Sequence, residues 1–237
     1  MMSQSESGRT EQFLTYFNEL EQHLRDSTDS ARNVPFGGLV ERASRSNAAI
    51  RHYGRQMREW SDLRNAVVHE HPKGRVIAEV TPEALEEFRG IVARVTTPPL
   101  VLPLFQRDVR VFKETDPLFE AVEDLWREGY SQVIVRKDRS MTLLSYAGIA
   151  RWMGQAVNGT TIDLGKATAG GALEFEEDGG IGFLGRTATV YDARELFQGF
   201  PGRRTQRLRV IVITEHGKST ESPLGLITAS DILEAEA

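Results

Sequence analysis

A strand passes directly into a helix at residues 225–233, which read Gly225-Leu226-Ile227-Thr228-Ala229-Ser230-Asp231-Ile232-Leu233. Thr228 and Asp231 have the spacing of a capping box, in which the hydroxyl accepts a hydrogen bond from a free backbone N–H and the acidic group reaches back. The same spacing sets a carboxylate beside free N–H groups, where it suits a grip on the two hydroxyls of a ribose. These four residues alone leave both interpretations open.

The elements around this stretch occur in two copies. From residue 109 the pattern predicts strand, helix, strand, strand and helix, and this order recurs loosely from about residue 182. Residues 208–214 are almost wholly β-branched and predict a strand that leads towards the stretch at 225–233. Residues 158–182, between the copies, are rich in Gly, Thr and Asp and predict an irregular loop.

Upstream of residue 96 the spacing is helical. We expect residues 1–10 to be frayed, and apolar stripes then predict three helices that pack as a small bundle. Thr81-Pro82 predicts the start of the third helix, after an extended segment at 75–80. Thr96-Thr97-Pro98-Pro99 reads as a linker, because proline does not extend a helix. The stripes are Phe13, Phe17, Leu20 and Leu24; Ile50, Tyr53, Met57, Trp60, Leu63 and Val67; and Leu85, Phe88, Val92 and Val95.

Composition narrows the classes of function. The 237 residues contain no cysteine, which excludes disulfides and thiolate metal sites. The sequence lacks a secretory apolar core or an apolar run long enough to span a bilayer, so we expect a cytoplasmic protein. A net charge of −5 does not suit a general binder of polyanions, so any contact with nucleic acid requires a local basic patch.

The C-terminal repeat resembles a tandem pair of CBS domains, a Bateman module. Gly225 to Leu233, after a valine-rich strand, carries most of the resemblance. It implies a regulatory adenosine ligand such as AMP, ATP or S-adenosylmethionine. It also implies that Thr228 and Asp231 contact the ribose and that Ile211 helps to hold the adenine.

The first copy departs from this pattern. Its corresponding run is Leu143-Leu144-Ser145-Tyr146-Ala147-Gly148-Ile149, where Ser145 keeps the cap but Gly148 replaces the acid. We therefore expect at most one standard nucleotide site. A pair that serves only as a dimerisation scaffold remains the alternative.

Residues 63–71 read Leu-Arg-Asn-Ala-Val-Val-His-Glu-His at the end of the second helical stripe. At about 100° per residue, Asn65 and His69 lie on the outward face, in line with a stripe of arginines. Histidine suits proton transfer, and arginine suits the charge of a phosphorane formed by attack of a ribose 2′-hydroxyl. The arginines that would contact RNA are Arg51, Arg55 and Arg58.

Arg64, Asn65 and His69 together resemble the signature of the HEPN superfamily, whose helical domains often dimerise. Many members are metal-independent ribonucleases of toxin and phage-defence systems, and others only bind or scaffold. The resemblance implies a catalytic role for these three residues. The structural alternative is that Arg64 pairs with Asp62 or Glu70 and that His69 is favoured by the helix dipole.

The predicted fold class is therefore α+β: a HEPN-like helical bundle over residues 1–97 and a tandem CBS (β-α-β-β-α) pair over 98–237, with copies at about 105–157 and 173–235. The predicted function is an adenine-nucleotide sensor that regulates a ribonuclease, in a homodimer that requires no metal. The alternative is a non-catalytic sensor whose helical domain is a dimerisation or partner platform. The class of process would be stress or phage defence.

Overall fold

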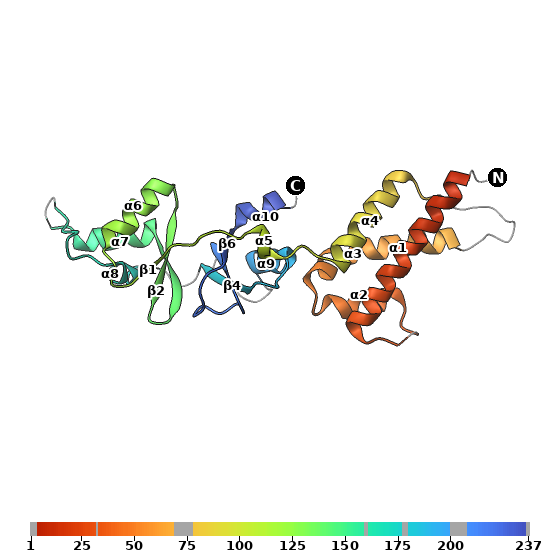
Figure 1. Cartoon of the computed structure of the whole chain (residues 1–237), viewed down its shortest axis with the longest axis horizontal. Coiled ribbons are helices and arrows are strands. Elements are labelled where there is room, and N and C mark those ends of the chain that lie inside the picture. Colours follow the sequence, from red (N-terminus) through yellow and green to blue (C-terminus); the bar gives the residue numbers. More distant parts are fainter. Residues whose placement is uncertain are drawn as a thin grey trace. The chain divides into compact units, whose positions relative to one another are not determined.

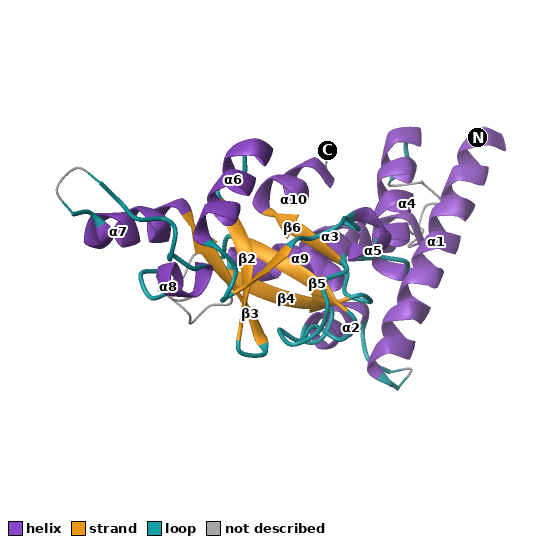
Figure 2. Cartoon of the chain, turned by 60° about the vertical axis from the view of Figure 1, so that its left-hand side comes forward, coloured by secondary structure: helices purple, strands orange, loops and turns teal. Residues whose placement is uncertain are grey.

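The structure is a computed structural model that describes residues 4–31, 33–68, 78–158, 161–176, 180–199 and 208–235. The chain divides into two compact units, Met1–Pro99 and Leu100–Ala237 (Figure 1). The described residues of the first unit form helices and loops, whereas the second unit combines helices with strands (Figure 2). The molecule is thus a mixed α+β protein with a helical N-terminal unit.

The helices of the N-terminal unit bury most of the apolar stripes that the sequence predicts, whereas Trp60, Leu63 and Val67 are only half-buried. The side chains of Phe13 and Phe88 are 0% exposed, and their ring centroids lie 4.9 Å apart. Trp60 packs on the same Phe88 ring at 5.1 Å. Tilted aromatic pairs of this kind stabilise a core beyond the area that they bury. The described helices are α1 (Gln4–Thr28), α2 (Phe36–Ser44), α3 (Ala48–Val68) and α4 (Pro82–Thr96), so the structure adds α2 to the three helices that the stripes predict.

The first residues of α1 and α4 can be compared with the helix starts predicted from the sequence. Thr81 accepts a hydrogen bond from Ala84 N at 3.2 Å with Pro82 in the first turn, so the predicted start of α4 is confirmed. The expected fraying of residues 1–10 is wrong from residue 4 onwards, because α1 begins at Gln4. Arg9 Nε donates to the carbonyl of Val80 at 3.1 Å, a tertiary contact that helps to order these polar turns.

The C-terminal unit has the predicted order of strand, helix, strand, strand and helix twice, and we call the two copies the first and second motif. The first motif contains β1 (Val111–Lys113), α6 (Leu118–Glu128), β2 (Gln132–Lys137), β3 (Ser140–Ser145) and α7 (Tyr146–Ala156). The second contains β4 (Ile181–Gly185), α9 (Val190–Gln198), β5 (Val210–Thr214), β6 (Gly225–Thr228) and α10 (Ala229–Ala235).

Each motif builds one sheet whose strands lie in sequence order. The first two strands are parallel, as a crossover helix requires, and the last two are antiparallel. The register pairs Val111 with Ile134 in the first sheet and Ile181 with Val210 in the second. The strand that leads into a motif's final helix therefore lies at the sheet edge, where the N-cap residues Ser145 and Thr228 are found.

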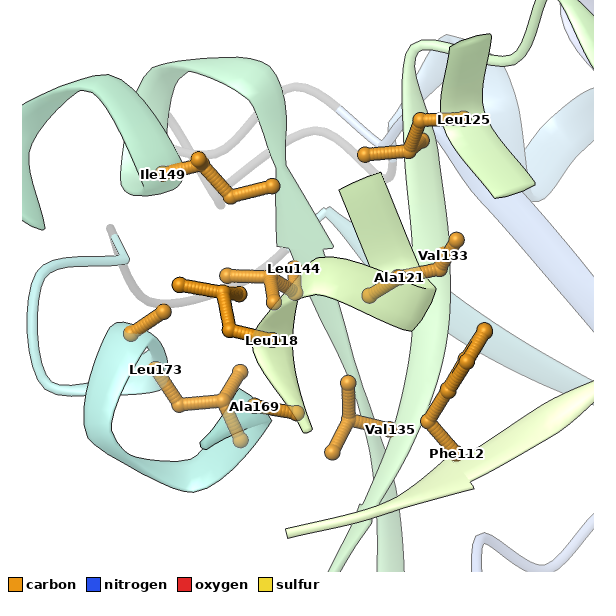
Figure 3. Packing of buried hydrophobic residues seen from close by; sticks show 11 residues of the cluster. Phe112, Leu118, Ala121, Leu125, Val133, Val135, Leu144, Ile149, Ala169 and Leu173 are labelled. Atoms are coloured by element: carbon orange, nitrogen blue, oxygen red, sulfur yellow. The ribbon is translucent and has the colours of Figure 1, made fainter. Parts of the chain in front are cut away.

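Two short helices connect the motifs by packing in the core of the other copy. α5 (Val101–Leu104) precedes the first motif, yet Val101 packs with β5, β6, α9 and α10 of the second. α8 (Ala169–Leu173) precedes the second motif, yet it packs on the core of the first beside Leu118 (Figure 3). The prediction of an irregular loop over 158–182 is therefore wrong at 169–173 and at the start of β4. Contacts with the first motif stabilise helix in a glycine-rich segment.

A further apolar cluster joins the two sheets. The members Ile134, Met141, Leu143, Val210 and Val212 are each at most 3% exposed. Because side chains alternate along a strand, Val210 and Val212 face the first motif while their neighbours face α9 and α10.

The amphipathic pattern of residues 118–126 predicts one apolar face with Leu118, Ala121, Val122, Leu125 and Trp126. One of these side chains is exposed. Leu118, Ala121 and Leu125 are 0% exposed, but Trp126 is 82% exposed. Trp126 directly follows Leu125 and so points about 100° away from it around the helix. Trp126 is therefore a surface residue and not part of the core.

Shortening a side chain in the cluster between the sheets will weaken the C-terminal unit. We expect Leu143→Ala to lower the free energy of unfolding by about 2–5 kcal/mol, because Leu143 is 2% exposed and its loss leaves a cavity. Denaturant unfolding followed by circular dichroism measures this. The matched control is Leu233→Ala, at a leucine that is 72% exposed, and an equal loss in both variants would contradict the assignment of the cluster.

Candidate functional site

A cavity of about 290 Å³ lies between the two motifs of the C-terminal unit. Its apolar wall comes from both sheets, and its polar rim comes from the segment before β1, from the turn after α6 and from the end of β6. Gly129 in that turn has a φ of 69°, a left-handed conformation that caps α6 and favours glycine. The apolar lining is Val109, Val133, Ile134, Leu143, Val210 and Leu226, and the rest is Arg107, Asp108, Arg110, Asp124, Gly129, Tyr130, Ser131, Gln132 and Thr228.

Thr228 and Asp231 form a reciprocal pair at the cavity rim. Asp231 Oδ2 accepts hydrogen bonds from Thr228 N at 2.6 Å and from Thr228 Oγ1 at 2.8 Å. Asp231 N donates to Thr228 Oγ1 at 3.4 Å. This is capping-box geometry, and it holds the carboxylate in one orientation. The other carboxylate oxygen, Oδ1, has no bond to Thr228 and faces Arg107.

Arg107 comes from the segment after α5, far from Asp231 in the sequence. Its Nη2 donates to Asp231 Oδ1 at 2.8 Å, and the side chains of Arg107 and Asp231 are 43% and 21% exposed. Burial acts to raise the pKa of Asp231, but the hydrogen bonds from Arg107 and Thr228 outweigh it and hold the pKa below its ordinary value of 3.8. The carboxylate is therefore charged at neutral pH.

A second arginine of the rim is fixed by α6. Arg110 Nη1 donates to Asp124 Oδ1 at 2.8 Å, and the Arg110 guanidinium lies 4.3 Å from the centroid of the Phe112 ring. Asp124 also accepts from Arg127 at 2.8 Å, so this 7% exposed carboxylate has two cationic partners. The rim thus holds two positioned guanidinium groups, which suit an anionic group such as a phosphate.

Two of the three predicted nucleotide-binding residues lie at this site. Thr228 lines the cavity. Asp231 is not a lining residue, but its carboxylate is hydrogen-bonded to Thr228 and Arg107, which both line the cavity. Ile211 does not line the cavity: its side chain is 0% exposed and packs with the helices of the second motif. Its neighbour Val210 lines the cavity instead, because alternate residues of β5 face opposite sides of the sheet.

Arg107 and Arg110 also line the cavity, and neither was predicted from the sequence. No local motif marks them, since both lie in a segment without helix or strand, between α5 and β1. The approach of Arg107 to Asp231 depends on α5 packing in the second motif. The only signal in the sequence is the short run of alternating charge at Arg107, Asp108 and Arg110.

The equivalent helix start in the first motif has a different acid. Ser145 caps α7 by accepting a hydrogen bond from Gly148 N at 3.2 Å, as the sequence predicts. The carboxylate of Glu176, which comes from the segment after α8, accepts hydrogen bonds from both Ser145 N and Ser145 Oγ. No motif in the sequence marks Glu176 for this contact.

The N-terminal candidate residues lie on α3, with one exception. Asn65 is exposed, while the half-buried Arg64 has its guanidinium 5.9 Å from the centroid of the Phe17 ring and donates to Asn65 Oδ1 at 3.4 Å. His69 lies outside the described residues. The predicted RNA-contact residues Arg51, Arg55 and Arg58 are all exposed on α3.

Two of those three arginines have contacts within the unit. Arg55 Nε pairs with Glu59 at 2.9 Å, and Arg51 donates to the carbonyl of Ser44. No cluster of three or more potential metal-ligating side chains is found in the described parts of the chain. Over the same residues, no helix has the length and apolar character that a membrane span requires.

Comparison with models of known protein families gives no match, and neither does comparison with curated protein sequences. Several solved structures are similar in fold. One is an archaeal protein from Methanocaldococcus jannaschii, described as a candidate homologue of g-AMPK, with 13% identity and a TM-score of 0.44 over 70% of this chain. The alignment spans 57% of that protein.

Other similar structures are CBS domain proteins. A CBS domain-containing protein from Kribbella flavida has 16% identity and a TM-score of 0.40, covering 58% of this chain and 98% of its own. CBSX2, solved in complex with AMP, has 14% identity and a TM-score of 0.39, covering 58% of this chain and 96% of its own. At these identities and TM-scores the likeness carries no family, ligand or activity over to this chain.

The lowered pKa of Asp231 makes the stability of the C-terminal unit depend on pH. A carboxyl group whose pKa is lower in the folded chain than in the unfolded chain stabilises the fold at pH values above its unfolded-state pKa. This stabilisation is lost as the pH falls through the pKa of the folded state. We expect Asp231→Asn to have a lower free energy of unfolding than the wild type at about pH 6. This difference in free energy should shrink below about pH 3.8. Denaturant unfolding across pH measures this. Glu234→Gln, an exposed acid of the same helix, is the control, and a gap that does not change with pH would contradict the expectation.

Proposed function

We propose that the C-terminal unit is a tandem CBS pair that binds an adenine nucleotide between its motifs and so regulates the N-terminal unit. The observation that carries this proposal is the meeting of Asp231 and Arg107 at the rim of a cavity lined by both motifs. A carboxylate held in one orientation suits a ribose, and a positioned guanidinium suits a phosphate. The order of elements and the run at 225–233 support the CBS assignment.

The parts of a nucleotide match the parts of the cavity. The apolar wall formed by residues such as Val133, Val210 and Leu226 suits the faces of an adenine. Thr228 fixes Asp231 Oδ2, so that Oδ1 is the oxygen that can accept from a ribose hydroxyl. Arg107 and Arg110 stand on the same rim for the phosphate. The cavity of about 290 Å³ is close to the lower end of the usual range for small-molecule sites, about 300–1,000 Å³.

The ion pair between Arg107 and Asp231 sets a condition on the ligand. A ribose hydroxyl that donates to Asp231 Oδ1 competes with Arg107 for this oxygen, and a guanidinium that gives way then lacks its anionic partner. A phosphate on the same ligand supplies a new partner, whereas a nucleoside does not. Among AMP, ATP and S-adenosylmethionine, this favours the phosphate-bearing nucleotides.

Calorimetry on the full chain tests the site. We expect AMP and ATP to bind more tightly than adenosine, with S-adenosylmethionine included as the phosphate-free alternative. Asp231→Ala should weaken AMP at least about tenfold, because hydrogen bonds to a charged group contribute about 1.5–3 kcal/mol each. Glu234→Ala, which removes an exposed acid three residues away, should leave the affinity unchanged. Equal affinities for AMP in wild type and Asp231→Ala would remove Asp231 from the site.

For the N-terminal unit we propose a HEPN-like, metal-independent ribonuclease with Arg64, Asn65 and His69 in the catalytic cleft. Arg64 would stabilise phosphorane charge, and His69 would transfer the proton. The support from the structure is that Arg64 and Asn65 are hydrogen-bonded neighbours on α3, with Arg51, Arg55 and Arg58 exposed along the same helix. A homodimer would bring two such sets to one cleft.

A non-catalytic role for this unit is the second candidate, and one contact favours it. The Arg64 guanidinium lies over the ring of Phe17, which is 2% exposed in the core of its own unit. This is a cation–π contact that serves packing without any substrate. In this case the helical unit is a dimerisation or partner platform for the nucleotide sensor.

Cleavage of RNA by purified protein separates the two candidates. If the unit is a nuclease, Arg64→Ala and His69→Ala should each lower the cleavage rate about 100-fold or more, since each removes a charge-stabilising or proton-transfer group. Arg89→Ala, at an exposed arginine of α4, is the matched control and should cleave like wild type. The reactions run with EDTA, and with and without AMP. If the RNA stays intact in every reaction, the ribonuclease proposal is wrong and the helical unit is a non-catalytic platform.

A further inference from the structure

The two final helices of the C-terminal unit begin in the same way with one difference in the sequence. Ser145 and Thr228 are the N-cap residues before α7 and α10. Three residues on, the second motif has Asp231, whereas the first motif has Gly148. On the sequence alone the first half-site has simply lost its acid.

Glu176 restores the missing carboxylate from 31 residues away. Its Oε2 accepts from Ser145 N at 2.7 Å and from Ser145 Oγ at 2.8 Å. Asp231 Oδ2 accepts from the same two atoms of Thr228, at 2.6 and 2.8 Å. The acid therefore occupies equivalent places in the two motifs, although it comes from the helix in one and from a linking segment in the other.

The Glu176 carboxylate occupies space that is available because Gly148 has no side chain. A Cβ atom at residue 148 would lie 2.3 Å from Glu176 Oε2 and 3.1 Å from the Glu176 carboxyl carbon. Any larger side chain at Gly148 therefore displaces the Glu176 carboxylate from Ser145. The glycine and the glutamate are a matched pair.

The two carboxylates differ in what remains open to a ligand. The Glu176 side chain is 7% exposed, compared with 21% for Asp231. Glu176 Oε1 also accepts from Ser145 Oγ at 3.0 Å and lies 3.6 Å from Arg209 Nη1. Asp231 Oδ1 has Arg107 as its hydrogen-bond partner. The two arginines are similarly exposed, at 40% for Arg209 and 43% for Arg107, so the difference lies in the carboxylates.

We propose that Glu176 is a built-in occupant that closes the first half-site, so that each chain binds one nucleotide, at Asp231. The closure itself rests on the contacts of Glu176 alone, and the nature of the excluded ligand rests on the proposed function. Replacing the pair by Asp at residue 148 and a small residue at 176 would then open a second site.

The first experiment needs no ligand and measures hydrogen exchange of the Ser145 amide in the full chain. Glu176→Ala removes its acceptor, and exchange should be at least about tenfold faster. Gly148→Ala should also speed exchange, because the added Cβ displaces the carboxylate. In the double variant, Gly148→Ala should add nothing to Glu176→Ala.

The matched control is Glu174→Ala, at an exposed glutamate of the same segment, which should leave the Ser145 amide as in wild type. If Gly148→Ala has no effect on this amide, or if the two single effects multiply in the double variant, the pairing of Gly148 with Glu176 is overturned.

The second experiment counts bound AMP by equilibrium dialysis on the full chain. Wild type should take up one AMP per chain, Asp231→Ala should lose it, and Gly148→Asp/Glu176→Ala should take up two. In the triple variant Gly148→Asp/Glu176→Ala/Asp231→Ala, one AMP should remain. Two AMP per wild-type chain, or no gain in the folded double variant, overturns the closure. If wild type takes up no AMP, ATP or S-adenosylmethionine, the proposed function is wrong. The exchange of the Ser145 amide still tests whether Glu176 binds Ser145 and depends on Gly148.

Discussion

The two three-stranded sheets of the C-terminal unit pack against each other through one apolar cluster, and this contact holds the two motifs together. Ile134, Met141 and Leu143 from one motif meet Val210 and Val212 from the other, all nearly inaccessible to solvent. This cluster forms part of the apolar wall of the cavity. α5 and α8 reinforce it, since each packs in the core of the motif that it does not lead into. Neither motif therefore completes its core without a segment that belongs to the other in sequence.

This exchange of short helices also brings the charged groups of the site together. Arg107 follows α5, and Glu176 follows α8, so each reaches the start of a helix in the motif against which its own linking helix packs. The segment after α5 places Arg107 beside Asp231, the acid of α10 itself. The segment after α8 places Glu176 at the start of α7, which has Gly148 at the corresponding position. The same architecture thus places an ion pair with Arg107 at one helix start and a more deeply buried carboxylate, beside Arg209, at the other.

Most of the fold was predictable because it follows from local periodicity. Alternation and β-branching predicted the order of strands and helices, and Thr81 predicted the start of α4. α8 was not predictable, because Ala169-Gly170-Gly171-Ala172-Leu173 has a low helix propensity and is stabilised by packing on the first motif. Trp126 was misplaced because the sequence does not show where the edge of a buried stripe falls.

Local periodicity predicted the order of the repeated elements, and contacts between near neighbours predicted the capping residues Ser145 and Thr228 and the acid at Asp231. No local pattern predicted that Ile211 faces the core, that Arg107 holds Asp231, or that Glu176 takes the place left by Gly148. The physical reason is distance along the chain. A cap is a bond between near neighbours, whereas these pairings exist only once two sheets have packed and their linking helices have crossed.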